Sequence, residues 1–179
     1  PGASVYLNGG SISTGVTELQ IGRHNLLVRS FGYEDWRGAI TIAEKQTTKV
    51  EAELKEAVFT LSDLRVSRRI FNPGNPGKLG TTRVNFDVNS WGNGEFVVSQ
   101  AGGGIVYSRP LTGFTTWEQS LEWDGRDSVG RVLPDGEYTA RIEASGLKEQ
   151  EMKSLMTTLT IDSTAVISYR SVLSGVSGL

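Results

Sequence analysis

Hydrophobic and polar residues alternate one by one along much of this chain, in runs that are too short for helices. The clearest case follows Gly136, where every second side chain is apolar: Tyr138, Ala140, Ile142 and Ala144. A period of two predicts a strand with one face buried and the other in water. The preceding residues 124–135 are rich in aspartate and glycine, and they predict a loop that connects this strand to one ending at Trp123.

The first 57 residues repeat a rhythm of short strands and turns. Alternation predicts four strands, at residues 3–7, 26–30, 36–42 and 48–54. Turn signals at such short spacing leave no room for helices of about ten or more residues, so this region is expected to be all-β. One alternative stays open, because residues 50–57 also contain good helix formers.

A second series of short strands begins at residues 59–61. Alternate apolar positions at residues 84–88 and 155–161 predict strands, and Trp91-Gly92-Asn93-Gly94 predicts a turn. About seven strands over roughly 105 residues is the size of an immunoglobulin-like (Ig-like) sandwich. The spacing Gly136-x-Tyr138 matches its tyrosine corner, in which a tyrosine hydroxyl binds the backbone a few residues upstream.

These patterns predict an all-β fold with two β-sandwich domains in tandem, the second Ig-like. The first domain is expected at residues 1–57 and the second at residues 58–162. Because no Pro/Ser-rich linker separates them, the junction should be short and stiff. Residues 163–179 form a tail, either the start of a further element or a final edge strand. The chain opens on Pro1 rather than methionine, which indicates a segment of a longer protein.

Composition narrows the possible functions. The net charge of −2 gives no basic field for phosphate backbones, so nucleic-acid binding is disfavoured. Cysteine is absent, which excludes disulfides, thiol catalysis and cysteine-ligated zinc. No apolar run approaches the ~20 residues of a membrane-spanning helix.

Glycine-rich motifs recur through the first domain: Pro1-Gly2-Ala3-x-Val5-Tyr6-Leu7-Asn8-Gly9, Gly15-x-Thr17, Gly22-x-His24 and Gly32-Tyr33-Glu34. Together they resemble the PEGA domain, a small surface-layer-type β-sandwich, over residues 1–57. The chain departs from that family in lacking the glutamate of its name and in having Glu18 where proline is usual. The resemblance implies a module of the cell envelope or cell surface.

Three motifs mark the second domain: Asn72-Pro73-Gly74-Asn75-Pro76-Gly77, Leu121-x-Trp123-Asp124-Gly125-x-Asp127-x-x-Gly130, and Leu133-Pro134-Asp135-Gly136-x-Tyr138. They resemble the Ig-like domain of the flagellar hook-capping protein FlgD, which is found at the ends of many secreted bacterial proteins. This FlgD-type resemblance covers residues 58–162 and implies an assembly or envelope domain.

Residues with catalytic or metal-binding chemistry are few. The single histidine, His24, follows a Gly-Arg turn and is expected to be structural, since catalysis and metal binding both need partners. Asp124, Asp127 and Asp135 flank one loop and could supply oxygen ligands to calcium. Aspartate is also the ordinary residue of Asx-turns, and we favour that structural use, with calcium binding left open. No catalytic, cofactor-binding or metal site is therefore assigned.

The four tryptophans bear on glycan binding. Trp117 and Trp123 lie on or beside predicted strands and are expected in the core. Trp36 and Trp91 could stay exposed, as the stacking rings of a sugar-binding module would, although core or rim packing is favoured.

The sequence thus predicts a non-catalytic structural or interaction segment of a larger bacterial cell-envelope or secreted protein, acting as a spacer or docking module. Its expected partners are proteins or cell-envelope components, which exposed edge strands could recruit by strand addition. A module that binds a cell-wall or surface glycan is the alternative. No cofactor and no nucleic acid are expected. By the two resemblances, the segment is placed outside the cytoplasm, in the periplasm, outer membrane or cell surface.

Overall fold

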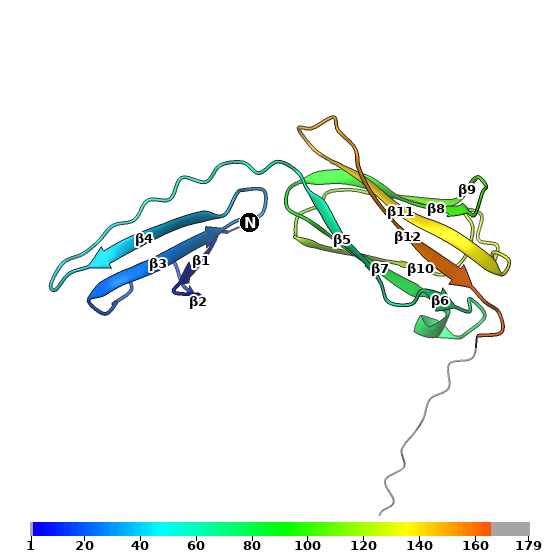
Figure 1. Ribbon diagram of the computed structural model, residues 1–179, viewed down its shortest axis with the longest axis horizontal. Coiled ribbons are helices and arrows are strands. Elements are labelled where there is room, and N and C mark those ends of the chain that lie inside the picture. Colours follow the sequence, from blue (N-terminus) through cyan, green and yellow to red (C-terminus); the bar gives the residue numbers. More distant parts are fainter. Residues whose placement is uncertain (1, 166–179) are drawn as a thin grey trace, which may run out of the picture.

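A computed structural model describes residues 2–165 as an all-β chain, with two modules side by side along its longest axis (Figure 1). The N-terminal module (residues 2–57) contains β1 (Ser4–Leu7), β2 (Gly10–Ile12), β3 (Gly22–Arg29) and β4 (Trp36–Ile42). The C-terminal module (residues 58–165) contains β5 (Leu61–Val66), β6 (Ile70–Phe71), β7 (Thr82–Val88), β8 (Gly92–Gln100), β9 (Ile105–Leu111), β10 (Glu118–Trp123), β11 (Gly136–Gly146) and β12 (Lys153–Ile161). One 3₁₀ turn, η1, spans Gly77–Gly80, and residues 2–165 contain no α-helix. The prediction for the tail beyond residue 165 lies outside the described residues.

The N-terminal module is a single antiparallel sheet in the order β2-β1-β3-β4. Asn8 and Gly9 connect β1 to β2 with φ of +48° and +89°, as the predicted tight turn requires. The strand register places Val5 of β1 beside Val28 of β3, so both side chains lie on one face of the sheet. On this face the buried side chains are those of Leu26 and Val28, near the C-terminal end of β3.

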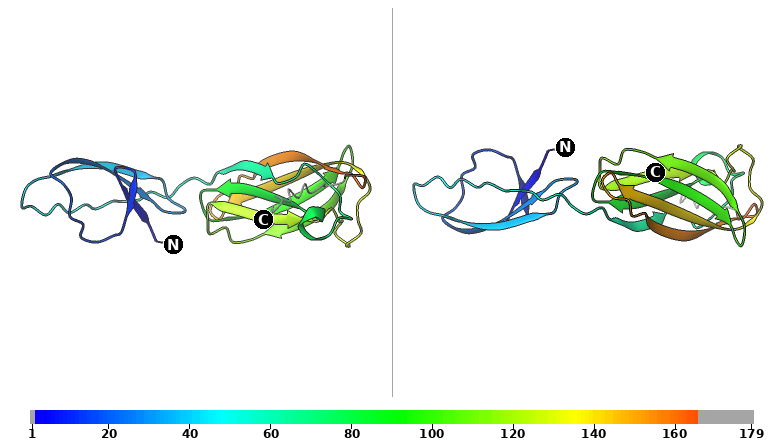
Figure 2. Two further views of the ribbon diagram at one scale, coloured as in Figure 1. Left: turned by 90° about the horizontal axis from the view of Figure 1, so that it is seen from below. Right: turned by 90° about the horizontal axis from the view of Figure 1, so that it is seen from above.

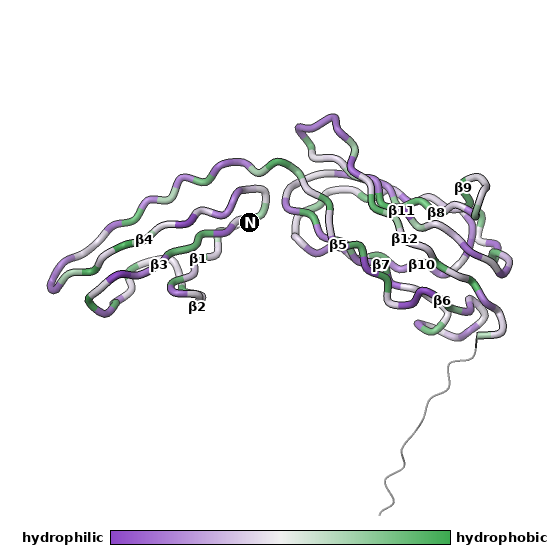
Figure 3. Tube along the Cα trace, in the orientation of Figure 1, coloured by the Kyte–Doolittle hydropathy of each residue, from purple (hydrophilic) through white to green (hydrophobic). Residues whose placement is uncertain are grey.

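The strand expected at residues 48–54 is wrong, and so is the alternative helix at residues 50–57. This segment is extended, and only its end is tied to the β3–β4 turn. The ties are an antiparallel bridge between Tyr33 and Glu56 and a 2.8 Å hydrogen bond from the Glu34 amide to the Lys55 carbonyl. Figure 3 shows that hydrophobic and hydrophilic residues do alternate along this segment, so periodicity alone does not make it a strand.

The register set by that bridge explains the missing ladder. Continued along β4, it would place Glu53 opposite Trp36 and Glu51 opposite Gly38. Trp36 and Gly38 lie on the face that carries Val28 and the other apolar side chains. Pairing would therefore bring two carboxylates onto the apolar face, and a shift of one residue would be needed to reverse this.

The C-terminal module is a sandwich of two sheets, seen as two layers in Figure 2. One sheet has the order β10-β7-β5 and the other β6-β12-β11-β8-β9, with β6 parallel to β12. In Ig nomenclature these are strands E-B-A and A′-G-F-C-C′, and the predicted Ig-like fold is confirmed. A single aromatic and aliphatic core fills the space between the sheets, and its largest fully buried residues include Trp123, Tyr138, Phe86 and Ile142.

The tyrosine corner forms as the sequence predicted. Tyr138 lies at the start of β11, and its hydroxyl donates a 2.7 Å hydrogen bond to the carbonyl oxygen of Pro134. Burial, and secondarily the carboxylate of Asp135, raises the pKa of Tyr138 above its ordinary value, so the phenol stays a donor. The bond fixes residues 134–138 where the chain crosses from the sheet of β10 to that of β11.

The turn expected at residues 91–94 is wrong in one respect, because Gly92 and Gly94 already belong to β8. A Cβ atom at either position would lie 2.3 Å from a carbonyl oxygen of β11, that of Ser145 or Glu143. These glycines therefore allow β8 to approach β11 closely rather than turning the chain.

We expect Tyr138→Phe to destabilise the protein by about 1 kcal/mol, because the Pro134 carbonyl loses its partner while the ring still fills the core. Urea unfolding measures the change. Tyr107→Phe is the matched control, since its hydroxyl makes no hydrogen bond within residues 2–165. Equal losses in the two variants would contradict a role for the corner.

Candidate functional site

The two modules meet at the β3–β4 turn, residues 30–35 (Figure 1). The Tyr33 amide donates a 3.1 Å hydrogen bond to the Ser30 carbonyl, and Gly32 has φ of +86°. A glycine with positive φ at the third of four turn residues is the signature of a type II turn. The turn places Phe31 at its tip, facing the C-terminal module.

Phe31 is part of the core of the module it does not belong to. Only 1% of its surface is exposed, and it belongs to the same contiguous cluster as Phe59 and Phe86. Its ring meets Trp91 at a centroid distance of 5.7 Å and Trp117 at 5.5 Å, with interplanar angles of 87° and 90°. Aromatic rings favour this edge-to-face arrangement beyond the gain from burial alone.

Gly32 brings the backbones of three segments together. Its amide donates to the Asn89 carbonyl at 2.9 Å, and its carbonyl accepts from the Ala57 amide at 3.0 Å. A Cβ atom here would lie 2.0 Å from the ring of Trp91. Only glycine satisfies both the positive φ and this contact.

Residues 58–60, at the start of the C-terminal module, form the linker to the N-terminal module. Side chains from elsewhere in the C-terminal module hold this linker in place. Asn89 accepts from the Thr60 amide at 2.7 Å and donates to the Val58 carbonyl at 2.8 Å. The Phe59 amide donates to Glu149, and the Phe59 ring is fully buried. A linker whose backbone groups are bonded in this way has little freedom to bend.

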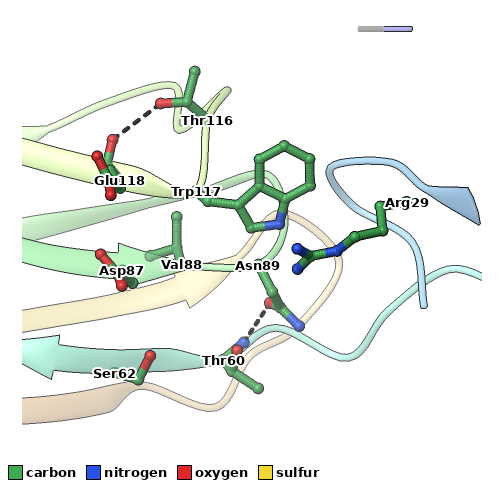
Figure 4. A pocket seen from close by; sticks show the side chains of 9 residues that line it. All are labelled: Arg29, Thr60, Ser62, Asp87, Val88, Asn89, Thr116, Trp117 and Glu118. Carbon is green, nitrogen blue, oxygen red and sulfur yellow. Dashed lines mark hydrogen bonds between the residues drawn. The ribbon is translucent and has the colours of Figure 1, made fainter. Parts of the chain in front are cut away.

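A groove of about 660 Å³ opens beside this junction (Figure 4). Trp117 forms one wall, and the guanidinium of Arg29 lies 5.7 Å from the centroid of its ring, within cation–π range. Asp87 of β7 and Glu118 of β10 lie directly opposite each other on the solvent face of their sheet. The groove thus combines a partly exposed indole with charges of both signs.

At the far end of the C-terminal module, two motif loops hold Ser163. The Asp135 carboxylate accepts from the Ser163 amide at 2.9 Å and from its hydroxyl at 2.7 Å, and Asn72 donates to its carbonyl at 2.7 Å. The side chain of Asp162 accepts from the hydroxyl and the amide of Thr164. The direction in which the chain leaves β12 is therefore set by side chains of the Asn-Pro and Pro-Asp-Gly motifs.

The residues considered for chemistry do not meet. His24 lies in the N-terminal sheet, where its Nδ1 accepts from Asn8 and its Nε2 donates to the Gln20 carbonyl. The three aspartates lie in the C-terminal module. Within residues 2–165, no three histidine, aspartate or glutamate side chains are grouped as a metal site would need.

Each aspartate instead bonds to the backbone. Asp124 accepts from the Arg126 amide, and Asp127 accepts from the amides of Val129 and Arg131, both of them the Asx-turn use that the sequence favoured. Burial alone would raise the pKa of Asp127, but these amides and the Arg131 guanidinium hold it below its ordinary value. Asp135 bonds to Ser163 rather than within its own turn.

The tryptophans differ from expectation at one position. Trp123 is buried, as predicted, whereas the core prediction for Trp117 is wrong, since 40% of it is exposed at the junction. Trp36 lies over Gly38, and Trp91 packs edge-on against Phe31 and Tyr33, which is the rim packing favoured for both.

Sequence reasoning missed Asn89 and Glu149, the residues that hold the linker. Neither lies in a motif, and their partners are 29 to 90 positions away along the chain. The Phe31-Gly32-Tyr33 triplet carried the one available signal, because an aromatic pair around a turn glycine is too apolar for a free loop tip.

The geometry defines a class of protein, a tandem of all-β modules with a bonded junction. Comparison with known families adds that residues 1–57 match the model of the PEGA domain, as the motifs indicated. PEGA domains are typically found in extracellular or periplasmic proteins, as modules of larger chains. No helix within residues 2–165 is long and apolar enough to cross a membrane.

No curated protein matches the chain. Among solved structures it is similar to dimeric latent PorU from Porphyromonas gingivalis, at 10% identity and a TM-score of 0.46, covering 89% of this chain and 16% of that one. It is also similar to the DNA glycosylase AlkC of Pseudomonas fluorescens (16% identity, TM-score 0.39, 59% and 31% covered) and to β-glucuronidase of Parabacteroides merdae (10%, 0.39, 89% and 24%). The chain thus spans less than a third of each, and at these TM-scores the likeness bears on no function of this chain.

We expect Gly32→Ala to disrupt the junction, because the new methyl group meets the Trp91 ring. Gly9→Ala is the control, since Gly9 has nearly the same φ, +89°, but no atom within 4 Å of the added Cβ. Backbone strain alone should cost about 1 kcal/mol at Gly9, and strain plus the clash at least about 2 kcal/mol at Gly32. Urea unfolding gives the two values, and hydrogen exchange of the Ala57 amide reports whether the junction opens. Similar losses in both variants, with Ala57 still protected, would contradict the contact.

The Asp162–Thr164 contact predicts a pH dependence. Hydrogen bonds from the Thr164 hydroxyl and amide lower the pKa of Asp162 below its ordinary value of 3.8. Its stabilising effect is therefore complete above that pH and is lost as pH falls through the lower, folded pKa. In a carboxyl ¹³C titration, Thr164→Val should raise the pKa of Asp162, whereas Ser163→Ala should leave it in place. An unchanged titration in Thr164→Val would contradict the assignment.

Proposed function

We propose that this chain is a non-catalytic spacer and docking segment of a larger bacterial cell-envelope or secreted protein. Its role is to hold the parts before and after it at a fixed distance and angle, outside the cytoplasm. Its partners would be proteins or other envelope components rather than nucleic acid.

The single observation that carries this proposal is the burial of Phe31. A flexible tether would leave the turn of one module in water, whereas here 1% of Phe31 is exposed. Burying a phenylalanine contributes about 1.5 to 3 kcal/mol, and each edge-to-face contact adds about 0.5 to 1.5 kcal/mol. These terms favour one relative orientation of the modules over the many that a free linker would allow.

The exit of the chain supports the same role. Ser163 is held by Asn72 and Asp135, so the direction of the chain is defined after β12 as well as between the modules. A spacer needs both of these constraints to transmit an orientation from one end to the other.

We further propose that residues 58–162 are an Ig-like domain of the FlgD type. The three motifs of the second domain support this assignment, and several of their side chains pack inside the fold. Trp123 is fully buried, and Pro73 packs over Gly125, where a Cβ would lie 2.5 Å from its ring. The PEGA match and this resemblance both support the proposed placement outside the cytoplasm.

A fixed spacer predicts that both modules align as one body. Residual dipolar couplings should fit a single alignment tensor in the wild type, and Phe31→Ala should separate it into two because the aromatic contact is lost. Val16→Ala is the control, in a side chain of the same module that is 97% exposed. Two different tensors in the wild type would contradict the spacer role. A single tensor in Phe31→Ala would assign the rigidity to the backbone bonds of Gly32 instead.

Glycan binding is a second candidate, and the exposure of Trp117 is the observation that favours it. A partly exposed indole beside carboxylates can stack on a sugar and accept hydrogen bonds from its hydroxyls. Soluble peptidoglycan fragments should then quench tryptophan fluorescence in the wild type but not in Trp117→Ala. Quenching that persists in Trp117→Ala would exclude this groove as the site.

A further inference from the structure

We propose that the free edge of β10 binds an extended, basic segment of a partner protein as an added strand. This inference deepens the docking part of the proposed function and rests on it.

Most other edges are closed to such pairing. On β9, Ser128 donates its amide to the Val106 carbonyl at 3.1 Å, its hydroxyl accepts from the Ser108 amide at 3.3 Å, and Pro110 has no amide hydrogen to offer. On β5, Asp63 has φ of +54° and interrupts the register. Bulges, prolines and capping groups are the ordinary means by which sheets close their edges.

The remaining edges are short or face the chain itself. Strands β2 and β6 have three and two residues. The edge of β4 lies beside residues 43–55. This segment starts at the C-terminal end of β4 and returns to its N-terminal end, where it bonds to the β3–β4 turn. By contrast β10 keeps six residues in unbroken register with β7 on one side. No strand within residues 2–165 pairs with its other side, where a single capping bond runs from the Thr116 hydroxyl to the Glu118 carbonyl at 3.0 Å.

The side chains along β10 define the partner's charge. Glu118, Ser120 and Glu122 lie on the solvent face of the sheet and are exposed. Glu118 is directly opposite Asp87, and like charges placed opposite one another are destabilising. Arg65 neutralises Asp87 at 3.0 Å, but Glu118 has no ion pair within the part of the chain the structure describes. An arriving lysine or arginine would relieve this repulsion.

A second copy of this chain is a poor occupant. Antiparallel pairing of two β10 strands centred on Ser120 would bring Glu118 opposite Glu122 twice, and Arg83, which pairs with Glu122 at 3.0 Å, offsets only part of this repulsion. A partner strand with lysine or arginine four residues apart meets both carboxylates instead, and Glu118 attracts it more strongly because Glu122 already pairs with Arg83. Apolar residues beside the basic ones would face the rim of the core, next to Leu121.

The groove at the junction lies at the Glu118 end of this edge. Its walls include Glu118 and also Arg29, whose guanidinium already lies over the Trp117 ring (Figure 4). Asp87 is paired with Arg65, so Glu118 is the carboxylate there that an arriving cationic side chain meets. The selection of a basic residue therefore rests on the carboxylates of β10 itself rather than on the groove.

The test uses two synthetic peptides and the ¹⁵N-labelled chain. The peptide Thr-Val-Lys-Val-Ser-Val-Lys-Val-Thr should bind with a Kd on the order of 10⁻⁴ M and shift the amides of residues 118–123. The same peptide with glutamate at both lysine positions should bind at least about tenfold more weakly. The double variant Glu118→Lys/Glu122→Lys should reverse this preference. The control Glu137→Lys/Glu151→Lys changes the net charge equally at exposed positions off this edge and should leave the preference intact.

Each outcome is decisive. If neither peptide binds, or the shifts map to another edge, Glu118 and Glu122 act only as gatekeepers against strand pairing and the proposal is overturned. If both peptides bind β10 equally, the charge selection is wrong. None of these results changes the dipolar couplings, so the failure of this inference is distinguishable from failure of the spacer role.

Discussion

The arrangement of this protein depends on one phenylalanine that lies in the core of its neighbouring module. Phe31 is presented by a type II turn, and the turn needs Gly32 both for its backbone conformation and for the space taken by Trp91. Gly32 donates its amide hydrogen to the Asn89 carbonyl and accepts from the Ala57 amide, and these bonds join the turn, the linker and the β7–β8 connection. The single sheet of the N-terminal module and the sandwich of the C-terminal module are thus joined by a contact that is aromatic, buried and bonded through the backbone.

Alternation along the sequence predicts most of this fold because the C-terminal sheets each bury one face. The pattern from Tyr138 to Ala144 gives β11 directly, and the tyrosine-corner spacing gives the hydrogen bond to Pro134. The same reasoning fails at residues 48–54, where alternation is present but the register imposed by the Tyr33–Glu56 bridge brings charges onto the apolar face. Local periodicity separates the apolar face of a strand from its polar face. Pairing also requires a register that puts the apolar faces of both strands on the same side of the sheet.

The junction could not have been predicted from the sequence to the same extent. Asn89 and Glu149 stand in no motif, and their bonds to Thr60 and Phe59 exist only once distant segments meet. Trp117 was expected in a core because it adjoins a strand, yet it lies at the rim where the two modules join. By contrast the turn role of Asp124 and Asp127 could be predicted from local spacing, since Asx-turns involve residues only two apart, whereas the bond of Asp135 to Ser163 could not.

The burial of Phe31 in the core of the other module also limits which domains could replace either module in such a tandem. The N-terminal sheet has few buried residues of its own. Separating the modules would expose Phe31 on one of them and leave a cavity between Trp91 and Trp117 on the other. Another domain could replace one module only if it supplied either an aromatic side chain to fill this space or a pocket to bury Phe31. The two modules are therefore distinct in sequence but physically coupled through this one side chain.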